Sequence, residues 1–405
     1  MPHAAKLRTL VSLFTGAGGL DLGLEAAGFE PRLCVEVDGD AMQTIKTNRG
    51  SWPIADPGDV HILGAEGVRR QSGLKPKELD LLAGGPPCQP FSKSAYWHRG
   101  DTSRLDDPRA KTLQAYLAIV EKLQPRVILL ENVRGIGYRS KSEGLMALAS
   151  ELVKINGRVG TAYDPGVHVL NAADYGVPQF RERVFLVAHR SGEKFIPPAA
   201  SHGPRVGQPY VTAWDAIGDL VGGDTEDLRA RGKWSELLPS IPEGANYLWH
   251  TPSGGGRPLF GWRTRYWSFL LKLAKDRPAW TIQATPGPAT GPFHWENRLL
   301  SIRELCRLQT FPDDYAITGD RRAAHRQIGN AVPCLLAERM GRAIQHQFFG
   351  RTTDAEFRYT IARRPNCPSP ERRRPVPRAF DSLRAEHAPH PGTGRGPGAT
   401  RRLGQ

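Results

Sequence analysis

Residues 9–19 read TLVSLFTGAGG, an apolar run that passes directly into a glycine-rich turn. The run is short and apolar, which predicts a buried strand over residues 9–14. Gly16, Gly18 and Gly19 predict a tight turn, at which the backbone can approach a ligand closely before a helix begins. A strand that feeds such a turn is typical of the first unit of an α/β sheet.

Similar apolar runs recur through the first 190 residues, with helical stretches between them, as in a doubly wound sheet. The further strands are predicted at 32–37, weakly at about 59–63, and at 79–83, 126–130, 166–170 and 183–188, with a helix at about 110–123. Candidate functional residues follow several of these strands. They therefore gather along one edge of the sheet, where open α/β sheets bind their ligands.

One cysteine stands in an unusually rigid setting. Residues 84–92 read GGPPCQPFS, and Pro86, Pro87 and Pro90 restrict the backbone around Cys88. The sulfur is therefore held in one direction before a substrate arrives. A lone cysteine is more often a small buried side chain, so the function of Cys88 depends on the motifs elsewhere in the chain.

Glu36 lies 20 residues beyond Gly16, at the end of the second predicted strand. An acidic residue at this place can accept hydrogen bonds from ribose hydroxyls, as in dinucleotide-binding enzymes. The glycine spacing differs from G-x-G-x-x-G, because Asp21 occupies the third position. This difference weakens the case for NAD as the cofactor.

Eight motifs occur in one order and together resemble those of the cytosine-5 DNA methyltransferases. The resemblance covers about residues 8–345, with a gap from about 190 to 295. The motifs are FTGAGG at 14–19, Glu36, GDV at 58–60, the Cys88 string, ENV at 131–133, QFRER at 179–183, RELCRLQ at 303–309 and QIGNAVP at 327–333. The resemblance implies a doubly wound, Rossmann-like, S-adenosylmethionine-dependent methyltransferase domain with a smaller inserted target-recognition domain.

The resemblance also implies catalytic roles. Cys88 would be the nucleophile, and Glu131 would donate to the ring nitrogen at position 3 of cytosine. Arg183 would hold the exocyclic oxygen, and Arg181 would support the loop or contact a phosphate. Residues 92–109 would form a lid. An alternative interpretation makes Glu131 and Arg183 a structural ion pair.

By the same resemblance the cofactor is S-adenosylmethionine. The residues implied are Phe14 against the adenine, Glu36 on the ribose, Asp59 on the adenine amino group, and Gly16, Gly18, Gly19, Asn330 and Val332 around the methionine portion. The alternative for Asp59 is a helix cap or turn acid.

Composition limits the class of protein. The 405 residues contain no apolar run near the ~20 residues of a membrane span. We expect a cytoplasmic protein that is associated with the nucleoid through DNA binding. The five cysteines are scattered without metal-ligand spacing, which predicts neither a metal site nor a disulfide framework. We expect a monomer.

We expect four segments: a catalytic cofactor-binding domain at 1–190, a target-recognition domain at 191–300, a helical return at 301–350 and a disordered basic tail at 351–405. The second segment holds seven of the nine tryptophans, and basic residues such as Arg257, Arg263, Arg265 and Lys272 interleave with its aromatics. This pattern suits a nucleic-acid surface, or else the tryptophans fill a small core. The tail carries twelve arginines against five acids and would touch phosphates non-specifically or have no role.

The sequence thus favours a bacterial-type enzyme that methylates carbon 5 of a flipped-out cytosine in a short specific sequence of double-stranded DNA, paired with a restriction endonuclease. One alternative is a transfer-RNA cytosine-5 methyltransferase, which shares the Pro-Pro-Cys-Gln loop. The other is a DNA-binding protein whose catalysis has decayed, although Cys88, Glu131 and Arg183 are all present.

Overall fold

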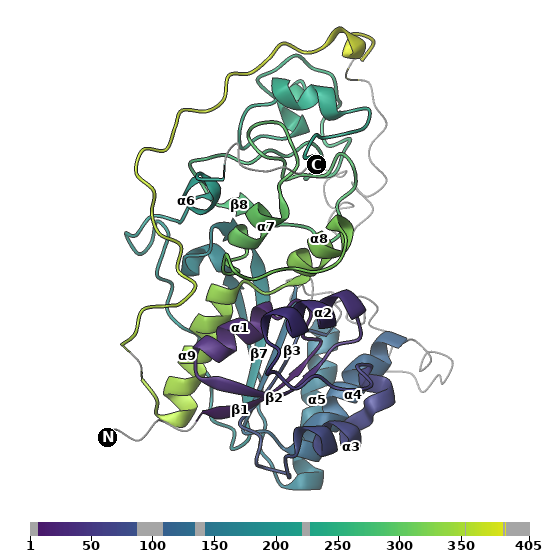
Figure 1. The fold of residues 1–405 in the computed structure, drawn as a ribbon, viewed down its shortest axis with the longest axis vertical. Helices are drawn as coiled ribbons and strands as arrows, with labels where there is room; N and C mark the ends of the chain where they lie inside the picture. The colour runs from purple at the N-terminus through teal and green to yellow at the C-terminus, as the bar shows by residue number, and fades with distance from the viewer. Residues whose placement is uncertain are drawn as a thin grey trace, which may run out of the picture. The chain divides into compact units, whose positions relative to one another are not determined.

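The computed structural model describes residues 7–86, 108–133, 142–220, 227–352, 354–383 and 385. The chain divides into two compact units (Figure 1). The first unit comprises Met1–Val177, Arg181–Pro209 and Gln309–Thr360; the second comprises Pro178–Phe180, Tyr210–Leu308 and Ile361–Gln405.

The first unit is built on a six-stranded sheet. Its strands are β1 (Arg8–Leu13), β2 (Phe29–Val35), β3 (Leu81–Gly84), β4 (Val127–Val133), β5 (Gly166–Asn171) and β7 (Glu182–His189). Their order is β2-β1-β3-β4-β7-β5. The first four strands are parallel, whereas β7 runs antiparallel to both β4 and β5. This arrangement is the predicted doubly wound sheet, in which one antiparallel strand, β7, lies next to the edge strand β5.

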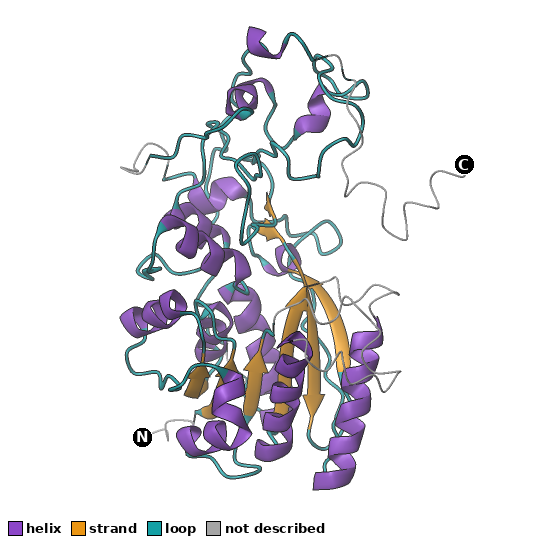
Figure 2. Ribbon diagram, turned by 90° about the vertical axis from the view of Figure 1, so that its right-hand side faces the viewer, coloured by secondary structure: helices purple, strands orange, loops and turns teal. Residues whose placement is uncertain are grey.

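Helices cover the sheet on both faces. The helices of this unit are α1 (Gly19–Ala26), α2 (Gly39–Asn48), α3 (Val60–Ser72), α4 (Pro108–Leu123), α5 (Ser142–Val159), α8 (Arg321–Asn330) and α9 (Cys334–Phe349), with a 3-10 turn, η4, at Ala172–Tyr175. Helix α1 packs with α9, and α3 packs with α4, which packs in turn with α5. Figures 1 and 2 show the sheet between these two layers.

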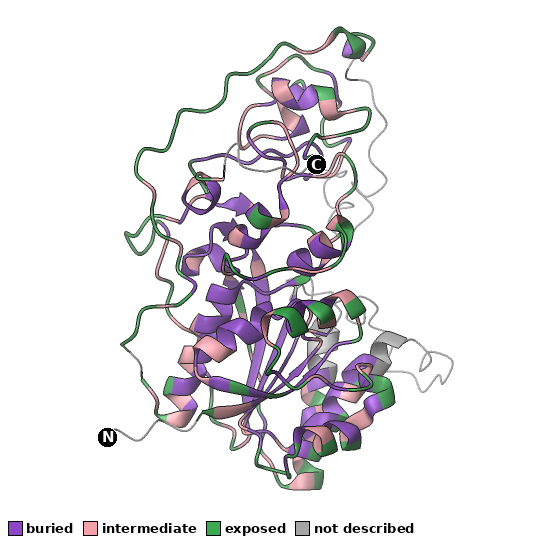
Figure 3. Cartoon of the chain, in the orientation of Figure 1, coloured by how far each residue is buried: buried purple, intermediate pink, exposed green. Residues whose placement is uncertain are grey.

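Burial on both faces explains the composition of the central strands. Leu10, Leu13, Leu81, Leu82 and Leu129 are fully buried, and Figure 3 shows the central strands mostly in the colour of buried residues. A strand covered on both sides has no solvent-facing positions, so its sequence is uniformly apolar rather than alternating.

The weak strand predicted at about 59–63 is wrong, because helix α3 begins at Val60 instead. The side chain of Asp59 accepts a hydrogen bond from the backbone N–H of His61 at 2.8 Å. This N-terminal cap satisfies a donor that the first helical turn leaves unpaired. The local cap therefore outweighs the short apolar run after it.

The second unit has little regular structure. Its elements are a parallel pair of short strands, β6 (Gln179–Phe180) and β8 (Ala279–Trp280), the helices α6 (Ala213–Ile217) and α7 (Ile302–Leu308), and the 3-10 turns η5 (Ser235–Ser240), η6 (Tyr247–His250) and η7 (Arg378–Phe380). A cluster of buried apolar residues holds the loops together; its aromatic members are Tyr247, Phe260, Phe269, Phe293 and Phe380.

The segment after residue 350 differs from the predicted disordered tail over the part that the structure describes. Tyr359 is buried in the first unit, where its hydroxyl donates to the carbonyl of Leu22. Phe380 is buried in the second unit. The composition of the whole segment hides these two aromatic anchors, which lie among many arginines and prolines. Residues 386–405 lie outside the described part of the chain.

Candidate active site

The candidate site lies at the carboxyl ends of β1 and β3. Strand β1 pairs with β2 on one side and with β3 on the other, so the order of the strands reverses at this point. In open α/β sheets, ligands bind at such a switch point, outside the carboxyl ends of the strands.

The glycine turn after β1 adopts a backbone that only glycine accepts without strain. Gly16 has φ +57° and Gly18 has φ +77°. A Cβ on Gly16 would meet no heavy atom within 4 Å, so this face of the turn has room for a ligand. A Cβ on Gly19 would lie 2.4 Å from the carbonyl oxygen of Val332, so the turn packs directly on the returning segment. The hydroxyl of Tyr315 also donates to the carbonyl of Ala17 at 2.9 Å.

Three backbone amides hold the carboxylate of Glu36. Gly16 N donates to Oε2 at 2.7 Å, and the amides of Val37 and Asp38 donate to Oε1 at 2.9 and 2.8 Å. A carboxylate has about four lone-pair sites, so Oε2 retains capacity for a ligand hydroxyl. Gly58 packs against the same residue, because a Cβ there would lie 1.9 Å from the carbonyl oxygen of Glu36. This contact brings the 58–60 motif beside the end of β2.

Asp59 and Phe14 border the same turn region. Asp59 caps helix α3, which was the alternative to a role in adenine binding. Its side chain is nevertheless half-exposed. Phe14 has φ +58°, an uncommon conformation for a residue other than glycine, and its ring is partly buried against the core of the first unit. Such strain is typical of functional sites.

Glu131 and Arg183 form a buried ion pair on the two antiparallel strands β4 and β7. Glu131 lies opposite Phe185, and Arg183 lies two residues further along β7, so the two side chains are diagonal neighbours on one face. Arg183 Nε lies 2.8 Å from Glu131 Oε1. Burial raises the pKa of Glu131 above its ordinary value, although the charges of Arg183 and Arg181 act in the opposite direction.

The start of the Cys88 loop is tied to this pair. A Cβ on Gly85 would lie 3.0 Å from Glu131 Oε2, so only glycine leaves the carboxyl oxygen its full space. Asn132 Nδ2 donates to the carbonyl oxygen of Pro86 at 3.1 Å. The chain is thus directed past Glu131 two residues before Cys88. Cys88 itself and the predicted lid at 92–109 lie outside the described residues, apart from the start of α4 at Pro108.

Arg181 is buried and binds the returning segment at 327–333. Its side chain is fully buried, and its Nη2 donates to the carbonyl oxygens of Gly329 and Ala331 at 2.6 and 2.9 Å. A buried guanidinium does not reach a DNA phosphate, so the structure does not favour the predicted phosphate contact of Arg181. The contacts do agree with a role in support, because they hold the segment that precedes Val332.

The segment at 327–333 returns to the glycine turn. Val332 is buried and touches the turn through its carbonyl, whereas Asn330 is exposed at the last residue of α8. Gln327 joins this segment to helix α2, because its Oε1 accepts a hydrogen bond from Thr44 Oγ1 at 2.8 Å.

Sequence reasoning missed two groups at this site. Asp21 is fully buried in the first turn of α1, two residues after Gly19. Asn132 follows Glu131 in the ENV motif, but its bond to Pro86 has no pattern in the sequence. Among the described residues, no three or more His, Cys, Asp and Glu side chains lie close enough to share a metal ion, and no helix is long and apolar enough to cross a membrane.

One residue of the predicted basic surface, Lys272, is not on the surface of the second unit. Lys272 is 3% exposed, and its Nζ donates to Ile241 O at 2.9 Å and to Asn297 Oδ1 at 2.7 Å. Burial lowers its pKa to about 8. Trp262 and Trp267, by contrast, are about half-exposed, and the guanidinium of Arg263 lies over the ring of Trp262. These side chains remain candidates for nucleic-acid contact.

Comparison with known proteins agrees with this geometry. The model of the family described as C-5 cytosine-specific DNA methylase matches residues 8–346. The Type II methyltransferase M.SacI of Streptomyces achromogenes is 38% identical over 84% of this chain and 93% of its own length. The Type II methyltransferase M1.HphI of Haemophilus parahaemolyticus is 30% identical over 83% of this chain and 86% of its own length. A solved structure from an E. coli prophage, described as a candidate DNA modification methyltransferase, has a TM-score of 0.58 at 25% identity and covers 85% of this chain and 100% of that one.

Proposed function

The chain belongs to the family of C-5 cytosine-specific DNA methylases, and on that premise we propose which of its residues carry out the reaction. It is a DNA (cytosine-5-)-methyltransferase of the restriction-modification type. The family match and the names of the relatives do not favour the alternatives of an RNA substrate or of decayed catalysis. The observation that supports the catalytic assignment best is the buried carboxyl of Glu131, held by Arg183 beside the start of the Cys88 loop.

Cys88 supplies the nucleophile. Carbon 5 of cytosine is a poor nucleophile, but addition of the Cys88 thiolate to carbon 6 breaks the aromaticity of the ring and moves electron density to carbon 5. The target base must leave the helix for this attack, because carbon 6 is out of reach inside a duplex. Once carbon 5 has taken the methyl group, loss of its proton allows the ring to expel the cysteine as thiolate and leaves 5-methylcytosine.

Glu131 supplies the proton or hydrogen bond that the ring needs as negative charge develops. Burial raises the pKa of Glu131, which favours the protonated form that can donate to the ring nitrogen at position 3. Arg183 orients this carboxyl through the 2.8 Å contact and would also bind the exocyclic oxygen. The ion pair is therefore part of the proposed catalytic arrangement rather than an alternative to it.

The turn around Gly16 fits S-adenosylmethionine, which when bound supplies a methyl group on a positively charged sulfur. The open face of Gly16 provides space, and Glu36 is held by three amides with acceptor capacity left for a ribose hydroxyl. Asp59 and Phe14 would bind the adenine. Asn330 and Val332 would line the methionine portion.

The assay is methyl transfer with labelled cofactor. Plasmid DNA methylated in cells is first sequenced after bisulfite treatment, which identifies the target sequence for the duplex substrates. Cys88→Ser should abolish transfer while DNA binding persists, because a hydroxyl is a much weaker nucleophile than a thiolate near neutral pH. A duplex with 5-fluorocytosine at the target should trap the wild-type protein covalently, since carbon 5 has no proton to lose. Activity of the Cys88→Ser variant within about tenfold of wild type would contradict the assignment.

The biological setting proposed is protection of DNA from a partner restriction endonuclease. The substrate is double-stranded DNA, the protein acts as a cytoplasmic monomer, and no metal takes part. The names of its relatives, Type II methyltransferases, support this setting.

A further inference from the structure

We propose that residues 361–383 form a DNA-binding strap of the second unit, which holds Arg372, Arg374 and Arg378 in place against the phosphates of the duplex. The inference rests on the proposed binding of double-stranded DNA and adds a contact surface outside the family match, which ends at residue 346. Three sets of anchors, one at each end and one in the middle, support it.

The first anchor lies where the strap begins. Asp215 accepts from Arg363 Nη1 at 3.0 Å and from the backbone N–H of Arg364 at 2.9 Å. The guanidinium of Arg364 also pairs with Asp219 at 2.7 Å. Asp215 is 5% exposed, so the strap begins against a buried carboxylate. The two arginines at the start of the strap are therefore occupied by the fold.

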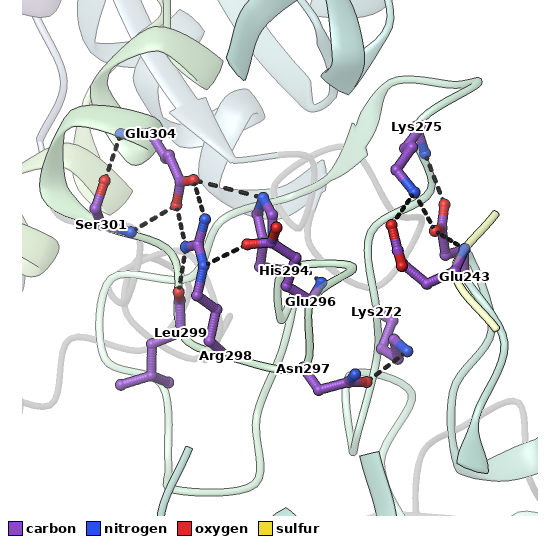
Figure 4. Close-up of polar contacts among 11 residues, drawn as sticks. Glu243, Lys272, Lys275, His294, Glu296, Asn297, Arg298, Leu299, Ser301 and Glu304 are labelled. Carbon is purple, nitrogen blue, oxygen red and sulfur yellow. Dashed lines mark hydrogen bonds and ion pairs between the residues drawn. The ribbon is translucent and has the colours of Figure 1, made fainter. Parts of the chain in front are cut away.

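The middle anchor is a buried lysine with two carboxylates. Lys275 Nζ lies 2.8 Å from an oxygen of Glu243, as Figure 4 shows, and 2.8 Å from an oxygen of Glu371 in the strap. The backbone N–H of Glu371 donates to Glu243 at 2.7 Å, and that of Arg374 donates to the carbonyl of Pro239 at 2.8 Å. Main-chain bonds thus fix the backbone on both sides of Arg372 and Arg373.

The third anchor is aromatic. Phe380 is 4% exposed and stacks on Trp234, with ring centroids 5.8 Å apart and an angle of 16° between the rings. The next residue, Asp381, pairs with Arg257 at 2.5 Å. Arg378 therefore lies on a short segment between the anchored run and this buried ring.

The acidic side chains of the strap pair with the second unit, whereas three of its arginines are exposed to solvent. Residues 361–383 contain six arginines and two acids, and both acids, Glu371 and Asp381, pair with cations of the second unit. Arg372, Arg374 and Arg378 are exposed, and within the described part of the chain none of them has an ion pair. Three exposed cations on a fixed backbone suit the regularly spaced phosphates of a duplex, and their backbone loses little further entropy on binding.

The test compares two triple variants with equal loss of charge. The strap variant is Arg372→Ala, Arg374→Ala and Arg378→Ala. The control is Arg32→Ala, Arg70→Ala and Lys75→Ala, which removes exposed cations of the first unit: one on β2, and two at the end of α3 and before β3, away from the carboxyl edge of the sheet. Binding is measured for a duplex with the target sequence and for an unrelated duplex, across a range of salt concentrations.

We expect the strap variant to bind both duplexes more weakly and to show a shallower dependence of log affinity on log salt. The slope should fall by about 0.9 for each phosphate that an arginine no longer neutralises, or by about 2.7 for all three. The control should keep the wild-type slope, and the melting temperature of the strap variant should not change.

An unchanged slope in the strap variant, or an equal change in the control, overturns the proposal. A weakening confined to the target duplex also overturns it, since phosphate contacts do not distinguish sequences. If the wild-type protein binds neither duplex, the proposed DNA-directed function fails instead, so the two failures are distinguishable.

Discussion

Replacing Asp21 by asparagine should stabilise the protein at alkaline pH and have little effect under acidic conditions. Asp21 is fully buried in the first turn of α1. Burial raises its pKa to about 7, and the charges of Glu36 and Glu25 act in the same direction, while the nearby hydroxyl of Ser12 opposes them. Asparagine has nearly the shape of the protonated acid and does not ionise.

The direction in which pH changes the stability follows from proton linkage. The unfolded chain loses the Asp21 proton near pH 3.8, whereas the folded chain keeps it to about pH 7. The stabilisation from the neutral side chain is therefore fully present below about pH 4 and declines as the pH rises to about 7. Each pH unit in this window costs roughly 1.4 kcal/mol, so the total is about 4 kcal/mol.

The measurement is the melting temperature of wild type and Asp21→Asn at several values between pH 4 and 8.5. At about 2–4 °C per kcal/mol for a unit of this size, the variant should melt roughly 10 °C higher than wild type at pH 8.5 and close to wild type at pH 4. Asp314→Asn, an exposed acid in the same unit, is the control and should show no such trend. A constant difference between Asp21→Asn and wild type across this range would refute the reasoning.

Two further substitutions test the cofactor site and the strap. Glu36→Ala should raise KM for the cofactor more than it lowers kcat, because it removes a ribose contact. The loss of about 1.5–3 kcal/mol corresponds to a cofactor affinity that is weaker by roughly 10- to 150-fold. An unchanged cofactor affinity by calorimetry would exclude the contact. Phe380→Ala should destabilise the second unit by about 3–5 kcal/mol, measured by denaturation followed through tryptophan fluorescence, and truncation after Thr360 should do the same or worse. A truncated protein that melts like wild type would restore the expectation of a dispensable tail.

Local patterns were enough to predict the sheet and most of the motif positions. Strands β1, β3 and β4 are recognisable in the sequence because each contains a short, mostly apolar run, at residues 10–13, 81–83 and 127–130, which is covered on both faces. The glycines at 16 and 18 likewise require positive φ, which few other residues accept. The order of the motifs then sufficed to predict the family, whose model matches residues 8–346.

Pairings over long sequence distances were decided only by the tertiary structure. The sequence did not reveal that Arg181 would be buried against Gly329, or that Lys272 would lie in the core of the second unit. Nor did it show that Glu371 would pair with Lys275, 96 residues earlier. Composition describes what a segment can bury by itself, whereas these groups are satisfied by partners that the fold brings from elsewhere. A charged side chain looks solvent-exposed in sequence until the fold supplies the opposite charge or the carbonyl that allows it to be buried.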